Sequence, residues 1–285
     1  MNKKIFFGAC FLLTAIIFSK SVNAKVWRIN NNAGVSRDFA QLSTAVANAS
    51  VVNGDTLYVE ASATAYNAVT FDKQLVVIGP GYFLTENTGL QANPNDVSIG
   101  SIILDSLASG SSFFGIHPGV LYTNSNTDNI TISRCQLQLF YNTSIANSKL
   151  SNWIINKCYL SQVNFAASSF IFENLQLTNS FLTSSFTIAG TMINGLLRNN
   201  IFLNGVIANN CYISNNIFLN GSTLTFTNCT VRYSISQVNN LPAGNNNQNN
   251  ITQASLFTLT GSSDGRYQLR MGSPASAAGE PISGV

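Results

Sequence analysis

Charged side chains are scarce in this sequence, and the few that occur nearly balance. Only 9% of the 285 residues are Asp, Glu, Lys or Arg, with 14 bases against 11 acids, whereas soluble domains usually have about 25%. A surface that binds nucleic acid needs clustered Lys and Arg, so no nucleic-acid partner is predicted. With 45% apolar residues, the chain also lacks the high charge and low hydrophobicity of disordered proteins.

The sequence also lacks an apolar run long enough to span a bilayer, which takes about 20 residues. The run Ile5–Phe18 follows a lysine pair and precedes Val22-Asn23-Ala24, a pattern typical of a cleavable signal peptide. We therefore predict a signal peptide over residues 1–24, a mature chain from Lys25 without a transmembrane segment, and export to the periplasm, the outer surface or the extracellular space. A membrane anchor and lipidation at Cys10 are the alternatives. The apolar run is too short for a membrane anchor, and the residues before Cys10 are a poor match to a lipobox.

Histidine and cysteine are too few to build the usual metal sites. His117 is the single histidine, and Cys135, Cys158, Cys211 and Cys229 follow no Cys-x-x-Cys spacing, so neither a metal ion nor a cofactor is predicted. An even number of cysteines in an exported chain permits disulfides, although the repeat pattern favours buried thiols. The chain also has no Gly-x-Ser-x-Gly elbow and no phosphate-binding glycine-rich loop.

Asparagine, by contrast, is abundant, and it accompanies a repeat. It occurs 38 times, most densely between residues 194 and 250, and it tolerates the left-handed backbone of tight turns. The repeat has the order apolar, any, apolar, any, any, small or Cys or Asn, any, apolar, which indicates a strand, a sharp bend and a second strand. Six stretches fit this template: Ile130–Leu137, Trp153–Leu160, Leu175–Leu182, Gly195–Phe202, Cys211–Phe218 and Leu224–Val231.

The spacing of these copies predicts a β-solenoid. Their first residues are 23, 22, 20, 16 and 13 positions apart, and the first three values suit one coil of a stack. The last two are short, so those copies mark either other faces of a coil or a wrong alignment. Equivalent residues of neighbouring coils would lie about 4.8 Å apart, with asparagine amides bonded from coil to coil. Cys135 and Cys158 would share an inward column, where a disulfide is disfavoured because it prefers Cβ atoms about 3.8 Å apart.

The two ends of the chain depart from the repeat. Asp38 as N-cap, Gln41 as its capping-box partner and apolar residues at helical spacing predict a capping helix over residues 37–49. This helix would cover the unpaired backbone and core of the first coil. Residues 251–285 are predicted to form a closing segment at the other end.

Several stretches of the mature chain carry a family resemblance. The N-terminal ones are Phe39-x-x-Leu42-x-x-Ala45-Val46, Gly54-Asp55-Thr56-Leu57-Tyr58-Val59 and Leu75-Val76-Val77-Ile78-Gly79-Pro80-Gly81. The later ones are Asn129-Ile130-Thr131-Ile132, the Asn-Asn-Ile-Phe copies at 199–202 and 215–218, and Ser263–Leu269 followed by Gly272-Ser273-Pro274-Ala275. Together they resemble pectate-lyase-like right-handed parallel β-helix proteins, and the last resembles the closing segment of exported β-helix repeat proteins from Bacteroidetes-type bacteria.

The resemblance implies an all-β fold, a single-stranded right-handed parallel β-helix that occupies residues 25–285 as one domain. It does not imply an activity, because this fold carries lyases, hydrolases, epimerases, adhesins and binding proteins. Such relatives usually continue into an Asp-x-Gly-Ala-Phe-Gly-like ending, which is absent from this sequence, and a truncation at Val285 is one interpretation of its absence.

Carboxylates are too sparse in the central repeat for the typical enzymes of this fold. Glu173 is the single acid between residues 129 and 263, whereas calcium takes about 6–8 oxygen ligands and a glycosidase needs paired carboxylates. Catalysis is therefore uncertain. A lyase is favoured over a glycoside hydrolase, because elimination needs a base and a group that neutralises a uronate. His117, Asp128 and Lys149 are the catalytic candidates. The simpler interpretation is that all three are loop residues that do not share a site.

Aromatic side chains favour carbohydrate as the partner, because sugar rings stack on exposed aromatic faces. Tyr159 and Tyr212 fall at outward template positions and are the candidate substrate-binding residues. Our first hypothesis is an exported cell-envelope or secreted protein that engages a polysaccharide or a cell-surface glycan along an extended face. The alternatives are a polysaccharide lyase that cleaves uronate-containing glycans by β-elimination, with Lys149 or His117 as the base, and a structural adhesin module.

Overall fold

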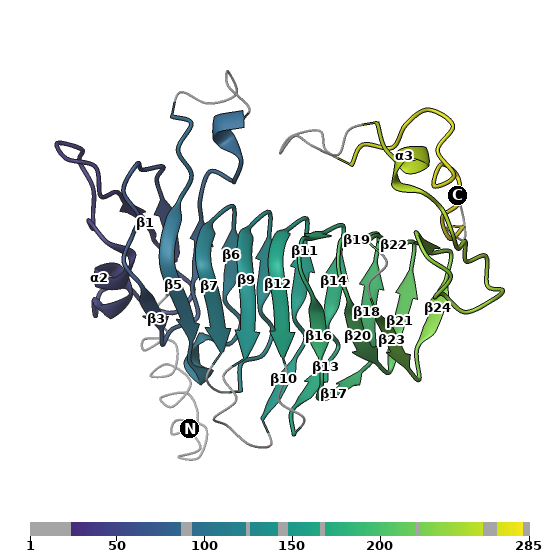
Figure 1. The fold of residues 1–285 in the computed structure, drawn as a ribbon. Helices are drawn as coiled ribbons and strands as arrows, with labels where there is room; N and C mark the ends of the chain where they lie inside the picture. Colours follow the sequence, from purple (N-terminus) through teal and green to yellow (C-terminus); the bar gives the residue numbers. More distant parts are fainter. Residues whose placement is uncertain are drawn as a thin grey trace, which may run out of the picture.

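The strands of this protein wind into a right-handed parallel β-solenoid of about eight coils, which confirms the predicted fold class (Figure 1). The computed structural model describes residues 24–86, 93–123, 126–141, 148–165, 169–220, 223–258 and 267–281. The predicted signal peptide, apart from Ala24, lies outside the described residues. Among the residues that the structure describes, no helix has the length and apolar character needed to cross a membrane.

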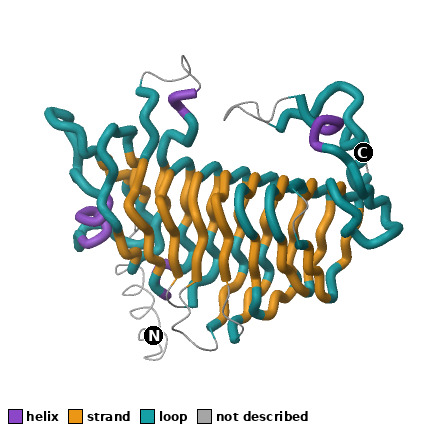
Figure 2. The backbone as a smooth tube through the Cα atoms, in the orientation of Figure 1, coloured by secondary structure: helices purple, strands orange, loops and turns teal. Residues whose placement is uncertain are grey.

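The coils stack as rungs whose strands form three sheets, and Figure 2 shows the loops gathered at the corners between them. The ten-stranded sheet contains, in spatial order, β1 (Val26–Ile29), β2 (Thr56–Val59), β4 (Val76–Ile78), β6 (Ser112–Phe114), β8 (Thr131–Ser133), β11 (Ile154–Asn156), β14 (Gln176–Thr178), β18 (Gly195–Arg198), β21 (Cys211–Ser214) and β24 (Thr230–Arg232). The three-stranded sheet contains β10 (Lys149–Ser151), β13 (Ile171–Glu173) and β17 (Thr191–Ile193).

The third face is a twelve-stranded sheet that branches. Its main path contains β3 (Val69–Phe71), β5 (Ser98–Leu104), β7 (His117–Thr123), β9 (Gln136–Tyr141), β12 (Tyr159–Phe165), β15 (Phe181–Leu182), β19 (Ile201–Phe202), β22 (Ile217–Phe218) and β25 (Ile235–Ser236). Its branch, which starts from β12, contains β16 (Phe186–Ile188), β20 (Val206–Asn209) and β23 (Leu224–Thr227).

The predicted inward residues form the core of the stack. One column runs in register through the ten-stranded sheet and contains Ile132, Ile155, Leu177, Leu197 and Ile213. None of these five side chains is more than 1% exposed. Since burying one aliphatic side chain contributes about 1.5–3 kcal/mol, such columns supply the main driving force for stacking. The hydrophobic alternation therefore predicted both the period and the inward face of these coils.

The sixth copy, as aligned, begins on another face of the coil, which is one of the two interpretations that its short spacing left open. Leu224 and Phe226 lie on β23 in the branch of the twelve-stranded sheet. The residue in register with Ile213 is Val231, and Ser236 is in register with Phe218. The sixth copy in register is therefore Cys229, Val231, Ser234 and Ser236, which raises its spacing from the fifth copy to 18 residues. The template also fits at Leu224 because a second bend in each coil produces the same residue pattern.

The two bends of each coil are built on left-handed residues five positions apart. The first column contains Asn129, Asn152, Asn174, Asn194, Asn210 and Asn228, and the second contains Arg134, Lys157, Asn179, Asn199, Asn215 and Tyr233. Asparagine suits both columns because it adopts positive φ at low cost. The exposed amides also bond along the stack as predicted: Asn152 Nδ2 donates to Asn129 Oδ1 (3.1 Å), and Asn174 Nδ2 donates to Asn152 Oδ1 (2.8 Å).

A second, buried polar ladder follows the second bend. The backbone N–H of Cys158 donates to Ser180 Oγ (3.1 Å), Ser180 N–H donates to Asn200 Oδ1 (2.9 Å), and Asn200 N–H donates to Asn216 Oδ1 (2.9 Å). Asn216 N–H then donates to Ser234 Oγ (3.2 Å). Each inward side chain thus satisfies the bend of the preceding coil, which a buried N–H requires.

The coils shorten toward the C-terminal end of the stack. The spacing of core residues in register falls from 23 residues between Ile132 and Ile155 to 16 between Leu197 and Ile213. The three-stranded sheet ends at β17, because in the next coil β20 is followed after a single residue, Asn210, by β21 of the ten-stranded sheet, which leaves no room for a further strand. In place of a further strand, Asn209 Oδ1 accepts a hydrogen bond from the backbone N–H of Met192 (2.8 Å), which lies on the edge strand β17.

The predicted N-terminal helix is shorter than expected and begins differently. Helix α2 spans Leu42–Ala47, and its N-cap is Gln41, without a side-chain cap bond. Asp38 instead accepts a hydrogen bond from the backbone N–H of Arg28 (2.8 Å), so the capping box was wrong. Leu42, Ala45 and Val46 of α2 are buried and join the core beside β2 and β3.

The C-terminal segment, with helix α3 (Gln253–Leu256), runs back along the solenoid (Figure 1). Leu256 and Phe257 pack in one apolar cluster with Leu219 and Ile235. Tyr267 reaches Phe181, with ring centroids 4.7 Å apart. This segment therefore covers part of an outer face as well as the last coils.

Candidate functional site

Two of the three catalytic candidates lie at the outer surface of the three-stranded sheet. Lys149 begins β10, and its Nζ lies 2.5 Å from Glu173 Oε2 on the neighbouring β13. Asp128 bridges to Ser151 of β10, whose hydroxyl donates to the Asp128 carboxylate. The hydrogen bond and charge of Glu173 raise the pKa of Lys149 above its usual value. Lys149 therefore stays protonated near neutral pH and is poorly suited to act as a general base.

The third candidate lies on a different face. His117 begins β7 of the twelve-stranded sheet, whereas Lys149 begins β10 of the three-stranded sheet and Asp128 bridges to that strand. Its Nδ1 lies 2.6 Å from Asp96 Oδ2. The structure thus brings Asp128 and Lys149 near each other, each with a new partner, and it does not bring His117 to them.

The His117–Asp96 pair opens onto a small pocket of about 250 Å³. Its other lining residues are Phe83, Leu84, Thr85, Pro94, Asn95 and Gln136. A carboxylate on Nδ1 orients an imidazole and leaves Nε2 to exchange a proton. None of these lining residues is cationic, so the described part of the pocket offers nothing to neutralise a uronate carboxylate.

A larger and more open depression, the corner groove, follows the first bend where the three-stranded sheet ends. Its volume is about 700 Å³, and its lining crosses three successive coils. Its lining includes Thr191 and Ile193 of β17, the bend residues Asn194, Asn210 and Asn228, and the outward residues Leu196, Tyr212 and Thr230. The last three stand in register on β18, β21 and β24, which Figure 1 shows side by side near the C-terminal end.

The corner groove is uncharged. Its lining residues in the described part of the chain are asparagines, threonines, aliphatic residues, a glycine, Tyr212 and the two buried residues Met192 and Cys211. Ile193 is 38% exposed, so an apolar surface faces the solvent beside the amides. Such mixed lining, with apolar contact area and a few polar groups, is typical of ligand sites in proteins.

A charged cluster holds Tyr212 at one side of this groove. The Tyr212 hydroxyl donates to Glu280 of the C-terminal segment, and Glu280 pairs with Arg198 (3.3 Å) and Arg232 (3.8 Å). The Arg198 guanidinium lies 5.8 Å from the Tyr212 ring centroid. Burial and then the Glu280 carboxylate raise the pKa of Tyr212, so its hydroxyl stays neutral. The ring is thereby fixed by contacts outside the groove lining.

The other predicted aromatic, Tyr159, occupies a different environment. It points outward from β12 and stacks on Phe181, with centroids 5.3 Å apart and planes at 23°. Phe83 meets it edge-on at 4.8 Å, and Tyr82 lies beside it while donating its hydroxyl to Lys157 O (3.3 Å). Tyr159 thus anchors the loop after β4 to the solenoid.

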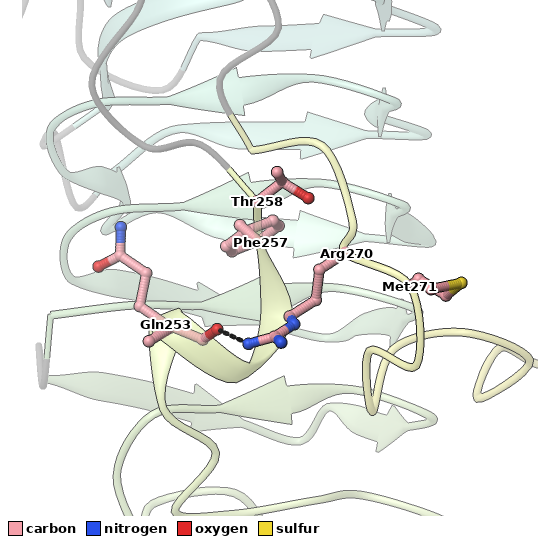
Figure 3. A pocket seen from close by; sticks show the side chains of 6 residues that line it. Gln253, Phe257, Thr258, Arg270 and Met271 are labelled. Atoms are coloured by element: carbon pink, nitrogen blue, oxygen red, sulfur yellow. Dashed lines mark hydrogen bonds between the residues drawn. The ribbon is translucent and has the colours of Figure 1, made fainter.

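A further pocket lies within the C-terminal segment (Figure 3). Gln253, Phe257 and Thr258 face Arg270 and Met271 across it, and Arg270 Nη1 donates to Ala254 O (2.9 Å). Residues 259–266, which join its two halves, lie outside the described residues, so we assign this pocket no function. Across the part of the chain that the structure describes, no three His, Cys, Asp or Glu side chains gather as metal ligands would.

Several of these partners were not predicted from the sequence. Asp96 precedes His117 by 21 residues, and Glu173 follows Lys149 by 24. Both separations are close to the length of one coil, and this was the one signal in the sequence that these residues could be neighbours. Comparisons with models of protein families, with curated proteins and with solved structures find no match.

Proposed function

We propose that this chain is an exported, non-catalytic protein that binds an uncharged polysaccharide in the corner groove. The observation that carries the proposal is the repetition of neutral groups across three coils: Leu196, Tyr212 and Thr230 in register, beside a column of bend asparagines. Solenoids present extended surfaces of this kind to long ligands. A polymer that lies along the stack would meet a similar set of groups every 4.8 Å or so.

The absence of charge in the groove lining favours a neutral glycan over a uronate polymer. Buried or partly buried carboxylates need cationic partners, and the lining provides amides and hydroxyls instead. Asparagine amides can both donate to and accept from sugar hydroxyls. The Tyr212 ring supplies the stacking surface.

Calorimetric titration against a panel of neutral and uronate-containing polysaccharides tests the proposal. We expect binding to at least one neutral polymer, and Tyr212→Ala should weaken it about tenfold, or about 1.4 kcal/mol. Tyr212→Phe keeps the ring and should bind nearly as well as the wild type. Tyr58→Ala is the matched control, since Tyr58 is 45% exposed on β2 of the same sheet at the other end of the stack. Absence of binding across the panel, or equal affinity of Tyr212→Ala and Tyr58→Ala, contradicts the proposal.

A polysaccharide lyase remains the second candidate because of the His117–Asp96 pair, whose Nδ1 and Oδ2 atoms are 2.6 Å apart beside a pocket. In that role Nε2 would remove the proton next to the uronate carboxylate. The ultraviolet absorbance of the unsaturated product measures this activity on uronate polymers. Activity that His117→Ala abolishes and Lys149→Ala preserves supports the lyase, and absence of product with the wild type removes it.

A further inference from the structure

Two thiols meet at the C-terminal end of the stack. Cys211 begins β21, and Cys229 lies one coil further on in the same column, because Tyr212 pairs with Thr230. Their Sγ atoms are 3.2 Å apart. Cys211 is 6% exposed, whereas Cys229 is half-buried. Cys229 is therefore the more accessible residue of the pair, and the Cys211 sulfur lies directly beside its own.

We propose that Cys211 and Cys229 form a site of thiol–disulfide exchange, at which a small disulfide reacts first with Cys229 and Cys211 then closes a bond between the two coils. This inference does not rest on glycan binding. The closed bond would tie together the two coils that line the C-terminal half of the corner groove.

The order of attack follows from the environments of the two sulfurs. The hydrogen bond between the two thiols lowers the pKa of Cys229 to about 7, although burial acts in the opposite direction. The same contact, followed by burial, raises the pKa of Cys211. Because the thiolate is the nucleophile, Cys229 is the thiol that attacks an external disulfide.

The exchange conserves atoms and electrons. The Cys229 thiolate attacks one sulfur of the small disulfide, breaks its S–S bond and releases one thiolate. Cys211 then loses its proton, attacks Cys229 Sγ and expels the second thiolate. Two protein thiols are oxidised, and one disulfide molecule is reduced to two thiols. The protein sulfurs move from 3.2 Å to a bonded distance of about 2.05 Å.

The chain contains a matched pair that lacks this geometry. Cys135 and Cys158 also lie one coil apart in one inward column, and they are free thiols as predicted. Their sulfurs donate to backbone oxygens, to Phe113 O from Cys135 (3.5 Å) and to Ile132 O from Cys158 (3.5 Å), rather than to each other. Burial raises the pKa of Cys135 to about 11 and that of Cys158 as well. This pair should remain unreactive in the folded protein.

Oxidised glutathione is a suitable probe. The purified protein is incubated with it under mildly alkaline conditions, free thiols are alkylated after denaturation, and peptides are identified by mass spectrometry. We expect a cross-linked peptide pair containing Cys211 and Cys229, with Cys135 and Cys158 alkylated. Full alkylation of Cys211 and Cys229 after prolonged oxidation, or equal cross-linking of the other pair, would overturn the proposal.

Two variants test the order of reaction. Cys211→Ser should accumulate a stable glutathione adduct on Cys229, since the resolving thiol is gone. Cys229→Ser should gain no adduct on Cys211 while it remains folded, as checked by circular dichroism. An adduct on Cys211 in the folded Cys229→Ser variant contradicts the assigned order of reaction, as does the absence of an adduct on Cys229 in the Cys211→Ser variant. If a variant fails to fold, the cross-link in the wild-type protein decides the proposal.

Discussion

Replacing Asn200 by alanine should destabilise the protein far more than changing its neighbour Asn199. Asn200 is 1% exposed. Its Oδ1 accepts from Ser180 N–H (2.9 Å), and its Nδ2 donates to Leu177 O (2.8 Å) and to Asn216 Oδ1 (3.1 Å). Alanine removes all three hydrogen bonds from a site that stays buried.

The magnitude follows from these contacts. The Ser180 N–H loses its acceptor, which costs about 2 kcal/mol, and the two other hydrogen bonds contribute about 1 kcal/mol each. We therefore expect a loss of about 4 kcal/mol in the free energy of unfolding. Urea denaturation followed by circular dichroism measures it.

Asn199→Gly is the matched control. Asn199 is an exposed bend residue with φ of 57°, and its amide makes one exposed bond, from Nδ2 to Asn179 Oδ1 (3.2 Å). Glycine keeps the left-handed backbone, so a change within about 0.5 kcal/mol is expected. A loss below about 1 kcal/mol for Asn200→Ala, similar to the control, would refute the role of the buried ladder.

Three other changes test separate parts of the structure. Burial opposes ionisation of Asp55, but hydrogen bonds from backbone and indole N–H groups lower its folded pKa. The stability that it contributes is present above its unfolded pKa of about 3.9 and is lost as pH falls through the lower folded value, so Asp55→Asn should flatten the acid-unfolding curve. Glu173→Gln should lower the pKa of Lys149, as followed by NMR titration of the amine; an unchanged value contradicts the ion pair. A Cys211–Cys229 disulfide should stabilise the protein by about 3 kcal/mol, measured by denaturation before and after oxidation, and no gain would count against the cross-link.

The hydrophobic pattern predicted the coil interior because stacking forces each coil to repeat it. Ile155 and Leu177 had to face inward once Ile132 did, and all three do. The pattern could not distinguish the two bends, since left-handed residues occur five positions apart in each coil. The pattern therefore left open the face on which Leu224 lies.

The candidate site was less predictable, because its pairings depend on where loops place single side chains. Lys149 meets Glu173 through a regular register between neighbouring strands, and a complete alignment of the coils would have predicted it. The contact of His117 with Asp96 involves a residue just before β5, outside the repeat template. The corner groove arises from the shortening of the coils after β17. The unequal spacings of the repeat copies indicated that the coils shorten, but they could not show at which corner of the coil the residues are lost.

Distances between spin labels along one outward column test the stacking most directly. Thr131, Ile154 and Gln176 align with Thr230 on the outer face of the ten-stranded sheet, five, four and three coils away. With Cys229 replaced by serine, labels at Thr230 and each of the others should give separations near 24, 19 and 14 Å, that is about 4.8 Å per coil. Separations that do not rise in equal steps with coil number would contradict the in-register stack.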